Sequence, residues 1–272
     1  MRLKEHAKSA IAFCFRHCSP LRRLAVFGTA QAENDRLLNL ARHFGVDRII
    51  DVGANHGQFA NDMRRGGFTG IIHSFEPLRE CYHYLRTVAE DDPDWRIHGM
   101  ALGDESGARA MHVANNGGLS SSFLNEIDLD YGFDVRFVDT EEVPMQRLDD
   151  VFGQLDLGSK CLLKLDTQGY ETFVIEGARI FLSRHRPIVF LESSLFPNYK
   201  GERLFDQVHA LMGELGLQHA LDNSLLELIV DTLPVFLGHR ATEHLIDRGI
   251  ERVRLFPFPP LPCRRGFLHL AG

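Results

Sequence analysis

Short apolar runs alternate with longer amphipathic segments over residues 45–220. The apolar run 48–52 stops at Gly53, as a buried parallel strand does. The amphipathic segment that begins near Gln58 predicts a helix, and the run 70–75 predicts the next strand. This alternation of strand and helix predicts an α/β fold with a doubly wound, mostly parallel, Rossmann-like sheet.

The same alternation continues through the second half of the chain. Residues 107–144 are the least regular part, with a loosely alternating strand at 107–113 and a loop at 115–122. The length and composition of that loop indicate a lid or a substrate loop, with a plain surface loop as the alternative. An antiparallel pair, 217–221 and 225–230, is expected to close a sheet of seven strands. The remaining predicted elements are helices at 78–88, 148–155, 171–182 and 201–215, and strands at 95–100, 161–166 and 187–192.

Length and composition predict one globular domain with two appendages. The chain has 272 residues, 44% of them hydrophobic and 25% charged, which is enough to bury a core. Residues 1–45 are expected to form an N-terminal helical extension, interrupted at Ser19-Pro20. Residues 46–232 would form the α/β domain, and the proline-containing tail 233–272 would pack on it.

The charge balance and the cysteines limit the partners that are expected. The net charge of −7, from 30 Lys and Arg against 37 Asp and Glu, disfavours a nucleic-acid partner. No apolar run has the length of a membrane span, so stable membrane insertion is not expected. Five scattered cysteines without paired ligand spacing suit a reducing cytoplasm and do not predict a zinc site. Whether the protein forms a homo-oligomer is left open by the sequence.

The first strand leads into the pattern Asp51-x-Gly53-x-x-x-Gly57, which differs from the dinucleotide fingerprint G-x-G-x-x-G. A carboxylate at position 51 would repel a pyrophosphate but would attract the ammonium group of an amino acid. The pattern therefore favours S-adenosylmethionine over NAD and disfavours a dehydrogenase. Glu76 ends the second strand, where a doubly wound fold places the carboxylate that binds a ribose. A glycine turn without any ligand is the alternative.

Acidic residues follow several of the predicted strands. Asp51, Glu76, Asp166 and Glu192 each stand at the end of one, so all four are expected at the sheet edge where such folds bind ligands. Lys164 lies two residues before Asp166, on the same strand face, and is expected to tune that carboxylate.

A further candidate ligand contact follows the predicted third strand. Ala101 and Leu102 could pack on the faces of an adenine, and Asp104 could accept a hydrogen bond from its amino group. A simple transition from strand to turn is the alternative for these residues.

Six segments together resemble the FkbM family of S-adenosylmethionine-dependent methyltransferases, which have the class I methyltransferase fold. The resemblance covers about residues 45–220 and would make residues 46–232 a class I methyltransferase domain. The first segment alone indicates only the class I fold, whereas the order and spacing of all six indicate the family. The segments are IIDVGANHGQFA (49–60), SFEP (74–77), MALGDESG (100–107), GLSSS (118–122), LLKLDTQGYETFVIEGA (162–178) and PIVFLES (187–193).

The resemblance implies a role for each matched position. Glu76 would bind the ribose hydroxyls, and Asp166 would face the transferred methyl group. Family members usually have Glu-Gly where this chain has Gln168-Gly169, so one negative charge is missing here. The turn around the methionine part would comprise Asp51, Gly53, Ala54, Asn55 and Gly57, and the adenine site Ala101, Leu102 and Asp104.

Methyl transfer to a hydroxyl group also requires removal of a proton. Asp166 could be the general base, with Glu192 and Lys164 beside it as further catalytic candidates. Alternatively, Asp166 and Glu192 could hold Mg²⁺, which would acidify the acceptor hydroxyl. A base without a metal is preferred, because only two oxygen-bearing side chains are identifiable for an ion.

The expected function is therefore S-adenosylmethionine-dependent O-methylation of a sugar, a polyketide or another small metabolite. The substrate class follows from the resemblance alone, since a fold does not fix a substrate. N-methylation is the nearest alternative. A non-catalytic S-adenosylmethionine-binding or scaffold protein is an alternative of a different class.

Overall fold

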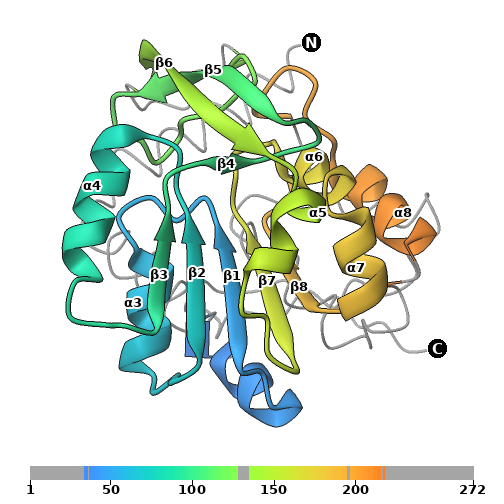
Figure 1. Ribbon diagram of the computed structural model, residues 1–272. Helices are drawn as coiled ribbons and strands as arrows, with labels where there is room; N and C mark the ends of the chain where they lie inside the picture. The colour runs from blue at the N-terminus through green and yellow to red at the C-terminus, as the bar shows by residue number, and fades with distance from the viewer. Residues whose placement is uncertain (1–33, 36, 128–134, 195–196, 216, 218–272) are drawn as a thin grey trace, which may run out of the picture.

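Five parallel strands form the central sheet of the computed structural model, which describes residues 34–35, 37–127, 135–194, 197–215 and 217 (Figure 1). The strand order β3-β2-β1-β7-β8 changes direction at β1, which pairs with β2 on one side and β7 on the other. In such sheets ligands bind beyond the carboxyl ends of the strands, where the order reverses. The strands are β1 (Arg48–Val52), β2 (Ile71–Phe75), β3 (Trp95–His98), β7 (Cys161–Leu165) and β8 (Ile188–Leu191).

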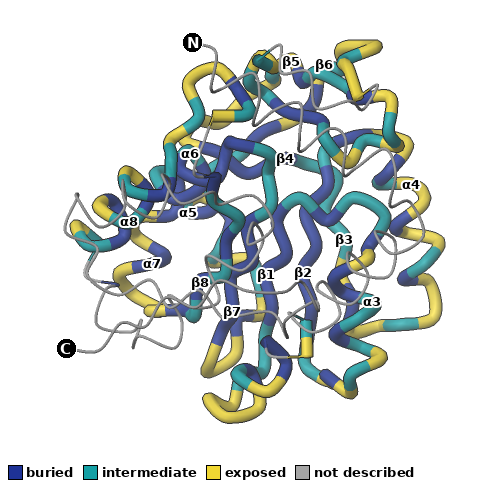
Figure 2. The backbone as a smooth tube through the Cα atoms, turned by 180° about the vertical axis from the view of Figure 1, so that it is seen from behind, coloured by how far each residue is buried: buried dark blue, intermediate teal, exposed yellow. Residues whose placement is uncertain are grey.

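Helices cover both faces of this sheet, and its three central strands β2, β1 and β7 are almost entirely buried (Figure 2). Side chains alternate along β1, where Ile50 and Val52 face one layer of helices and Ile49 faces the other. The α/β architecture is therefore confirmed. The first layer contains α5 (Leu148–Val151), α6 (Glu171–Glu176), α7 (Arg179–His185) and α8 (Phe205–Glu214), and the second contains the helical residues 37–44, α3 (Gln58–Arg65) and α4 (Arg79–Val88).

A second, mixed sheet of three strands has the order β4-β6-β5. It consists of β4 (Ala101–Leu102), β5 (Gly107–Ala114) and β6 (Phe137–Gln146). Outside this sheet, the short 3₁₀ helix η1 (Phe152–Gln154) follows α5. Figure 1 shows this sheet lying across the end of the central sheet toward which the arrowheads point. It therefore stands over the edge where a ligand is expected.

The strand predicted at 107–113 is confirmed as β5, whereas the strand β6, which pairs antiparallel with it, was not predicted. Most of β6 exposes one face, and its acidic residues Glu141 and Glu142 conceal the apolar alternation that predicts strands. The predicted strand 95–100 is also too long. The strand ends at His98, the chain bends at Met100, and Ala101 already pairs with β6 in the second sheet.

The helix predicted over 171–182 is in fact two helices. The helix is interrupted at residues 177–178, where the backbone of Gly177 packs so closely on Gly103 that a Cβ atom would lie 1.8 Å from the Gly103 carbonyl oxygen. The helix predicted from residue 201 begins only at Phe205. Before it, the Glu202 carboxylate accepts the backbone N–H groups of Asn198 and Tyr199 and holds a turn.

Several predictions lie outside the described residues. They concern the helices before residue 34, the C-terminal strand pair after residue 217, and the packing of the tail 233–272. The total of seven strands and the domain boundaries accordingly stay predictions. None of the helices in the described part of the chain combines the length and the apolar composition that a bilayer crossing requires.

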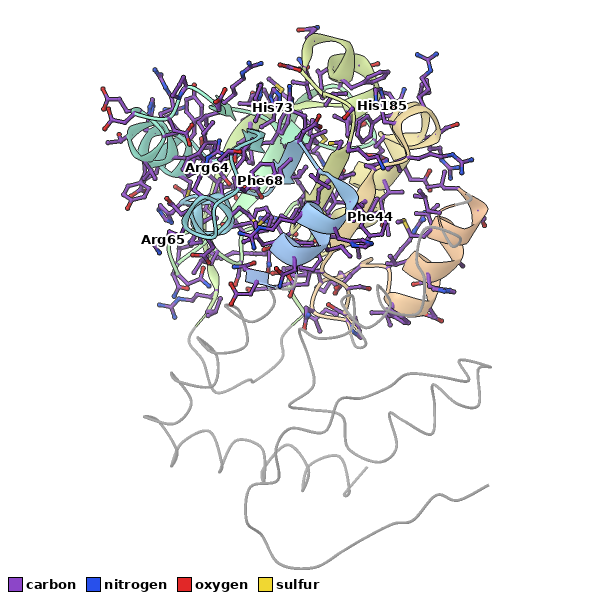
Figure 3. The ribbon with its side chains drawn as sticks, turned by 90° about the horizontal axis from the view of Figure 1, so that it is seen from below. Phe44, Arg64, Arg65, Phe68, His73 and His185 are labelled. Carbon is purple, nitrogen blue, oxygen red and sulfur yellow. The ribbon has the colours of Figure 1, made fainter. Side chains whose placement is uncertain are left out.

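The guanidinium group of Arg64 links several segments by hydrogen bonds at the amino-terminal edge of the sheet. Figure 3 is seen from that edge and shows Arg64 next to Phe68, whose ring centroid lies 5.7 Å from the guanidinium carbon. Arg64 donates to the carbonyl oxygens of Phe68 and Gly70 and to the carboxylate of Asp92. These hydrogen bonds join the end of α3 to the start of β2.

Replacement of Gly177 by alanine should test the contact between the junction of α6 with α7 and the segment that follows β4. We expect Gly177→Ala to lower the free energy of unfolding by at least about 2 kcal/mol, because its methyl group would overlap the Gly103 carbonyl. Urea unfolding measures this quantity. Gly153→Ala is the control, since no atom lies within 4 Å of its added Cβ. Equal stabilities for the two variants would contradict the packing described here.

Candidate active site

A cavity of about 320 Å³ opens at the carboxyl ends of β1, β2 and β7, beneath the second sheet. Its volume lies in the range of small-molecule sites. Of the predicted catalytic residues, Lys164 and Asp166 line it, whereas Glu192 does not. Six predicted cofactor contacts also line it: Gly53, Ala54, Asn55, Glu76, Ala101 and Leu102. Asp51, Gly57 and Asp104 are not among the lining residues.

The turn between β1 and α3 passes closely between its neighbours. Gly53 has φ +76°, and a Cβ atom there would lie 1.9 Å from the Asp166 carbonyl oxygen. A Cβ atom on Gly57, at φ +81°, would lie 2.9 Å from the Trp95 ring. Asn55 also has a positive φ, 47°, which asparagine tolerates better than most residues. The two glycines of the sequence pattern are therefore required by backbone conformation and by space.

The ammonium group of Lys164 is buried beneath this turn. Asp51 and Lys164 are directly opposed in the pairing of β1 with β7, and their side chains are 0% and 6% exposed. Lys164 Nζ lies 3.1 Å from Asp51 Oδ1 and donates to the Gly53 carbonyl oxygen at 3.1 Å. Asp166 Oδ2 lies 3.6 Å away. Burial lowers the pKa of Lys164, but the neighbouring carboxylates outweigh burial and raise it, so the ammonium stays protonated.

Asp51 thus has an ionic partner within the protein. Its second oxygen accepts a hydrogen bond from Ser74, and Ser74 in turn accepts one from the indole of Trp95. The predicted direct contact between Asp51 and the ammonium group of a cofactor stays a prediction. In the structure, Asp51 contacts Lys164, and it is Lys164 that lines the cavity.

Glu76 is a buried carboxyl group held by backbone donors. Its two oxygens accept the N–H groups of Asn55 at 2.7 Å and Leu78 at 2.9 Å. Burial raises the pKa of Glu76 to about 7, although these two hydrogen bonds favour the charged form. Each carboxylate oxygen can accept more than one hydrogen bond, so capacity remains for hydroxyl groups in the cavity.

The second sheet supplies an apolar wall on the other side of the cavity. Ala101 and Leu102 are buried, and Met111 and Phe123 line the cavity with them. Asp104, which was predicted at the adenine site, is exposed and accepts a hydrogen bond from the hydroxyl group of Tyr170. It is the ring of Tyr170 that lines the cavity.

The carboxyl groups beyond β7 and β8 form a linked group. The amide nitrogen of Gln168 donates to Asp166 Oδ1 at 2.9 Å and to Glu192 Oε2 at 3.3 Å. Burial, followed by the charge of Asp166, raises the pKa of Glu192 well above its usual range. Nearby, the carboxyl group of Glu171 is buried and accepts hydrogen bonds from the backbone and the hydroxyl group of Thr167.

Residues that sequence reasoning did not assign to the site also line the cavity. Tyr170 and Gln168 belong to the segment 162–178. The predicted turn between its strand and its helix is the feature of the sequence that could have indicated them as site residues. Gly118 and Leu119 line it from the loop 115–122, so this loop reaches the cavity as a substrate loop would. Its movement as a lid stays a prediction. Among the residues that the structure describes, no three His, Cys, Asp or Glu side chains are grouped so as to hold a metal ion.

Removal of the buried ammonium group should strongly destabilise the protein. In Lys164→Met the Asp51 carboxylate would stay buried without its partner, and we expect a loss of about 3–5 kcal/mol in the free energy of unfolding. The double variant Asp51→Asn, Lys164→Met removes both charges and should be more stable than Lys164→Met alone. Urea unfolding of wild type, Asp51→Asn, Lys164→Met and the double variant measures these losses. A double variant whose loss equals the sum of the two single losses would argue against the ion pair.

The buried carboxyl group of Glu171 should make stability depend on pH. Burial raises its pKa from 4.5 to about 7, so the fold prefers the protonated form and loses stability as pH rises from about 4.5 through 7. Glu171→Gln removes this titration. The free energy of unfolding of Glu171→Gln, relative to that of wild type, should increase by about 3 kcal/mol between pH 4.5 and 7, since one pKa unit corresponds to about 1.4 kcal/mol. Unfolding by urea at several pH values tests this, with exposed Glu90→Gln as a control that should show no such trend.

The chain is similar to a known protein family and to a solved structure. A family model described as the methyltransferase FkbM domain matches residues 51–219. The crystal structure of methyltransferase FkbM from Methylobacillus flagellatus KT is 17% identical, with a TM-score of 0.41, over 62% of this chain and 37% of that one. No curated protein matches the sequence. The family model covers more than half of the chain and confirms the resemblance of the six segments. The chain therefore belongs to the FkbM methyltransferase domain family.

Proposed function

We propose that this protein transfers a methyl group from S-adenosylmethionine to a hydroxyl oxygen of a small metabolite. The observation that carries the proposal is the placement of two carboxyl groups on opposite sides of β1. Glu76 follows β2 and Asp166 follows β7, and both line one cavity with the glycine turn between them. One carboxyl group is thus available for cofactor binding and the other for proton removal.

The residues present fit this cofactor. Glu76 retains acceptor capacity for the ribose hydroxyls after its two backbone hydrogen bonds. The aliphatic side chains of Ala101 and Leu102 offer an apolar wall for the adenine, and the backbone of 53–55 would surround the methionine part. S-adenosylmethionine, when bound, supplies a methyl group made electrophilic by a sulfonium sulfur.

Asp166 is the residue proposed to remove the acceptor proton. Its side chain is 42% exposed and lines the cavity, whereas Glu192 and Glu171 do not line it. The protonated Lys164 lies 3.6 Å from Oδ2 and cannot itself accept a proton. Asp166 Oδ2 can therefore take the proton of an acceptor hydroxyl, without a metal ion.

The chemistry of the cavity also bears on the acceptor. Among the described residues that line it, Asp62, Glu76 and Asp166 are acidic, and the one cation, Lys164, is already engaged by carboxylates. This balance suits a neutral hydroxyl-bearing molecule better than a phosphorylated one.

Calorimetric titration with S-adenosylhomocysteine should reveal the cofactor site. We expect micromolar binding to wild type and at least about tenfold weaker binding to Glu76→Ala, because hydrogen bonds to a charged carboxylate contribute about 1.5–3 kcal/mol. Exposed Glu90→Ala should bind like wild type. Thermal unfolding of each variant establishes that it is folded. Absence of binding to folded wild type would refute the cofactor assignment.

Asp166→Asn should separate binding from catalysis. We expect it to bind S-adenosylhomocysteine within about threefold of wild type, while methyl transfer falls by about 10²–10⁴ through loss of the base. Transfer by wild type should persist in EDTA. The rates are measured with an acceptor found by screening hydroxyl compounds for cofactor turnover. Full activity of the variant would instead make Asp166 structural, and activity lost in EDTA would favour a metal ion.

A further inference from the structure

Gln168 has a backbone conformation that is unusual for a residue with a side chain. Its φ is +55°, in the left-handed region, and Gly169 follows at φ +88°. A non-glycine residue in this region costs free energy, so its surroundings must hold it there. Gly169 makes room for part of these surroundings, because a Cβ atom at that position would lie 2.9 Å from the Tyr199 ring.

Hydrogen bonds tie Gln168 to three separate segments. Its amide nitrogen donates to Asp166 Oδ1 and Glu192 Oε2, and its amide oxygen accepts from the Tyr199 hydroxyl at 2.9 Å. Its backbone oxygen accepts from the Ser122 hydroxyl at 2.7 Å. The orientation of the amide follows from its partners, since the Asp166 carboxylate accepts hydrogen bonds and the Tyr199 hydroxyl group can donate one. Burial raises the pKa of Tyr199, which keeps that hydroxyl protonated.

The amide stands where two acidic side chains converge. Asp166 and Glu192 follow adjacent strands, in which Leu165 pairs with Leu191. Two nearby carboxylates repel each other and would attract a divalent cation if their oxygens were free. The amide nitrogen supplies one N–H group to each carboxyl group and adds no charge.

We propose that Gln168 is a positioning residue whose uncharged amide clamps Asp166 and Glu192 and occupies the oxygens that a divalent cation would otherwise bind. The clamp orients Asp166 toward the cavity, and this part of the inference rests on the proposed function. The exclusion of a cation does not depend on methyl transfer. Gln168→Glu, which is nearly the same shape, would replace the donor by a third carboxylate and create a cation site.

Thermal unfolding at pH 8 with and without about 10 mM Mg²⁺ tests the exclusion of a cation. We expect Mg²⁺ to raise the Tm of Gln168→Glu by at least about 3 °C, because a ligand that binds only the folded state stabilises it. Wild type and the exposed control Gln154→Glu should change by less than about 1 °C. An equal rise in wild type, or no rise in Gln168→Glu, would overturn the proposal.

Gln168→Met tests the orientation of Asp166, because it keeps the length and neutrality of the side chain but removes both donors. We expect S-adenosylhomocysteine binding within about threefold of wild type, KM for the acceptor nearly unchanged, and kcat lowered at least about tenfold. A variant with lowered Tm and unchanged kcat would show a merely structural role and overturn this part. If wild type binds no S-adenosylhomocysteine, the proposed function fails, and the Mg²⁺ experiment still decides on the clamp.

Discussion

The ammonium group of Lys164, withdrawn from water between β1 and β7, holds together the parts from which the site is built. Asp51 faces it across the strand pair, the Gly53 carbonyl accepts its hydrogen bond, and Asp166 lies beyond. Burial of a charge costs several kcal/mol unless partners in fixed positions offset it. Here those partners are Asp51 near the end of β1, the Gly53 carbonyl group in the glycine turn, and Asp166 directly after β7. The same contacts that satisfy the charge therefore fix the floor of the cavity.

Around this cation, similar carboxyl groups have different environments and can serve different chemistry. Glu76 is buried, with one backbone N–H group on each oxygen, and Glu171 is buried against Thr167. Glu192 lies behind Gln168, and Asp166 alone of these four is substantially exposed to the cavity. Burial favours the neutral form of a carboxyl group, and a neighbouring ammonium favours the charged form. The exposure of Asp166 agrees with its proposed role as the acceptor of a proton.

The second sheet adds a wall to the cavity at the edge of the central sheet. Its strands lie across the carboxyl ends of the central strands (Figure 1). Met111, on β5, lines the cavity from this sheet. Tyr170 connects the two parts, because its ring is buried in the core while its hydroxyl group meets Asp104 and Arg109. Stacking on Phe173 fixes the ring further.

Local periodicity by itself determined the α/β fold, the acidic residues that follow its strands and the two glycines of the first turn. These features depend on residues close in sequence, whose apolar spacing and conformational needs are visible in the chain. Only the tertiary structure decided that β6 pairs despite its polar face, that Asp51 is bound to Lys164, and that Tyr170 lines the cavity while Asp104 stays outside. Those outcomes depend on strand register and on contacts between distant segments, and a shift of one residue in a strand turns each side chain to the other face. The clamp formed by Gln168 has the same origin, since its partners come from separate segments that only folding brings together.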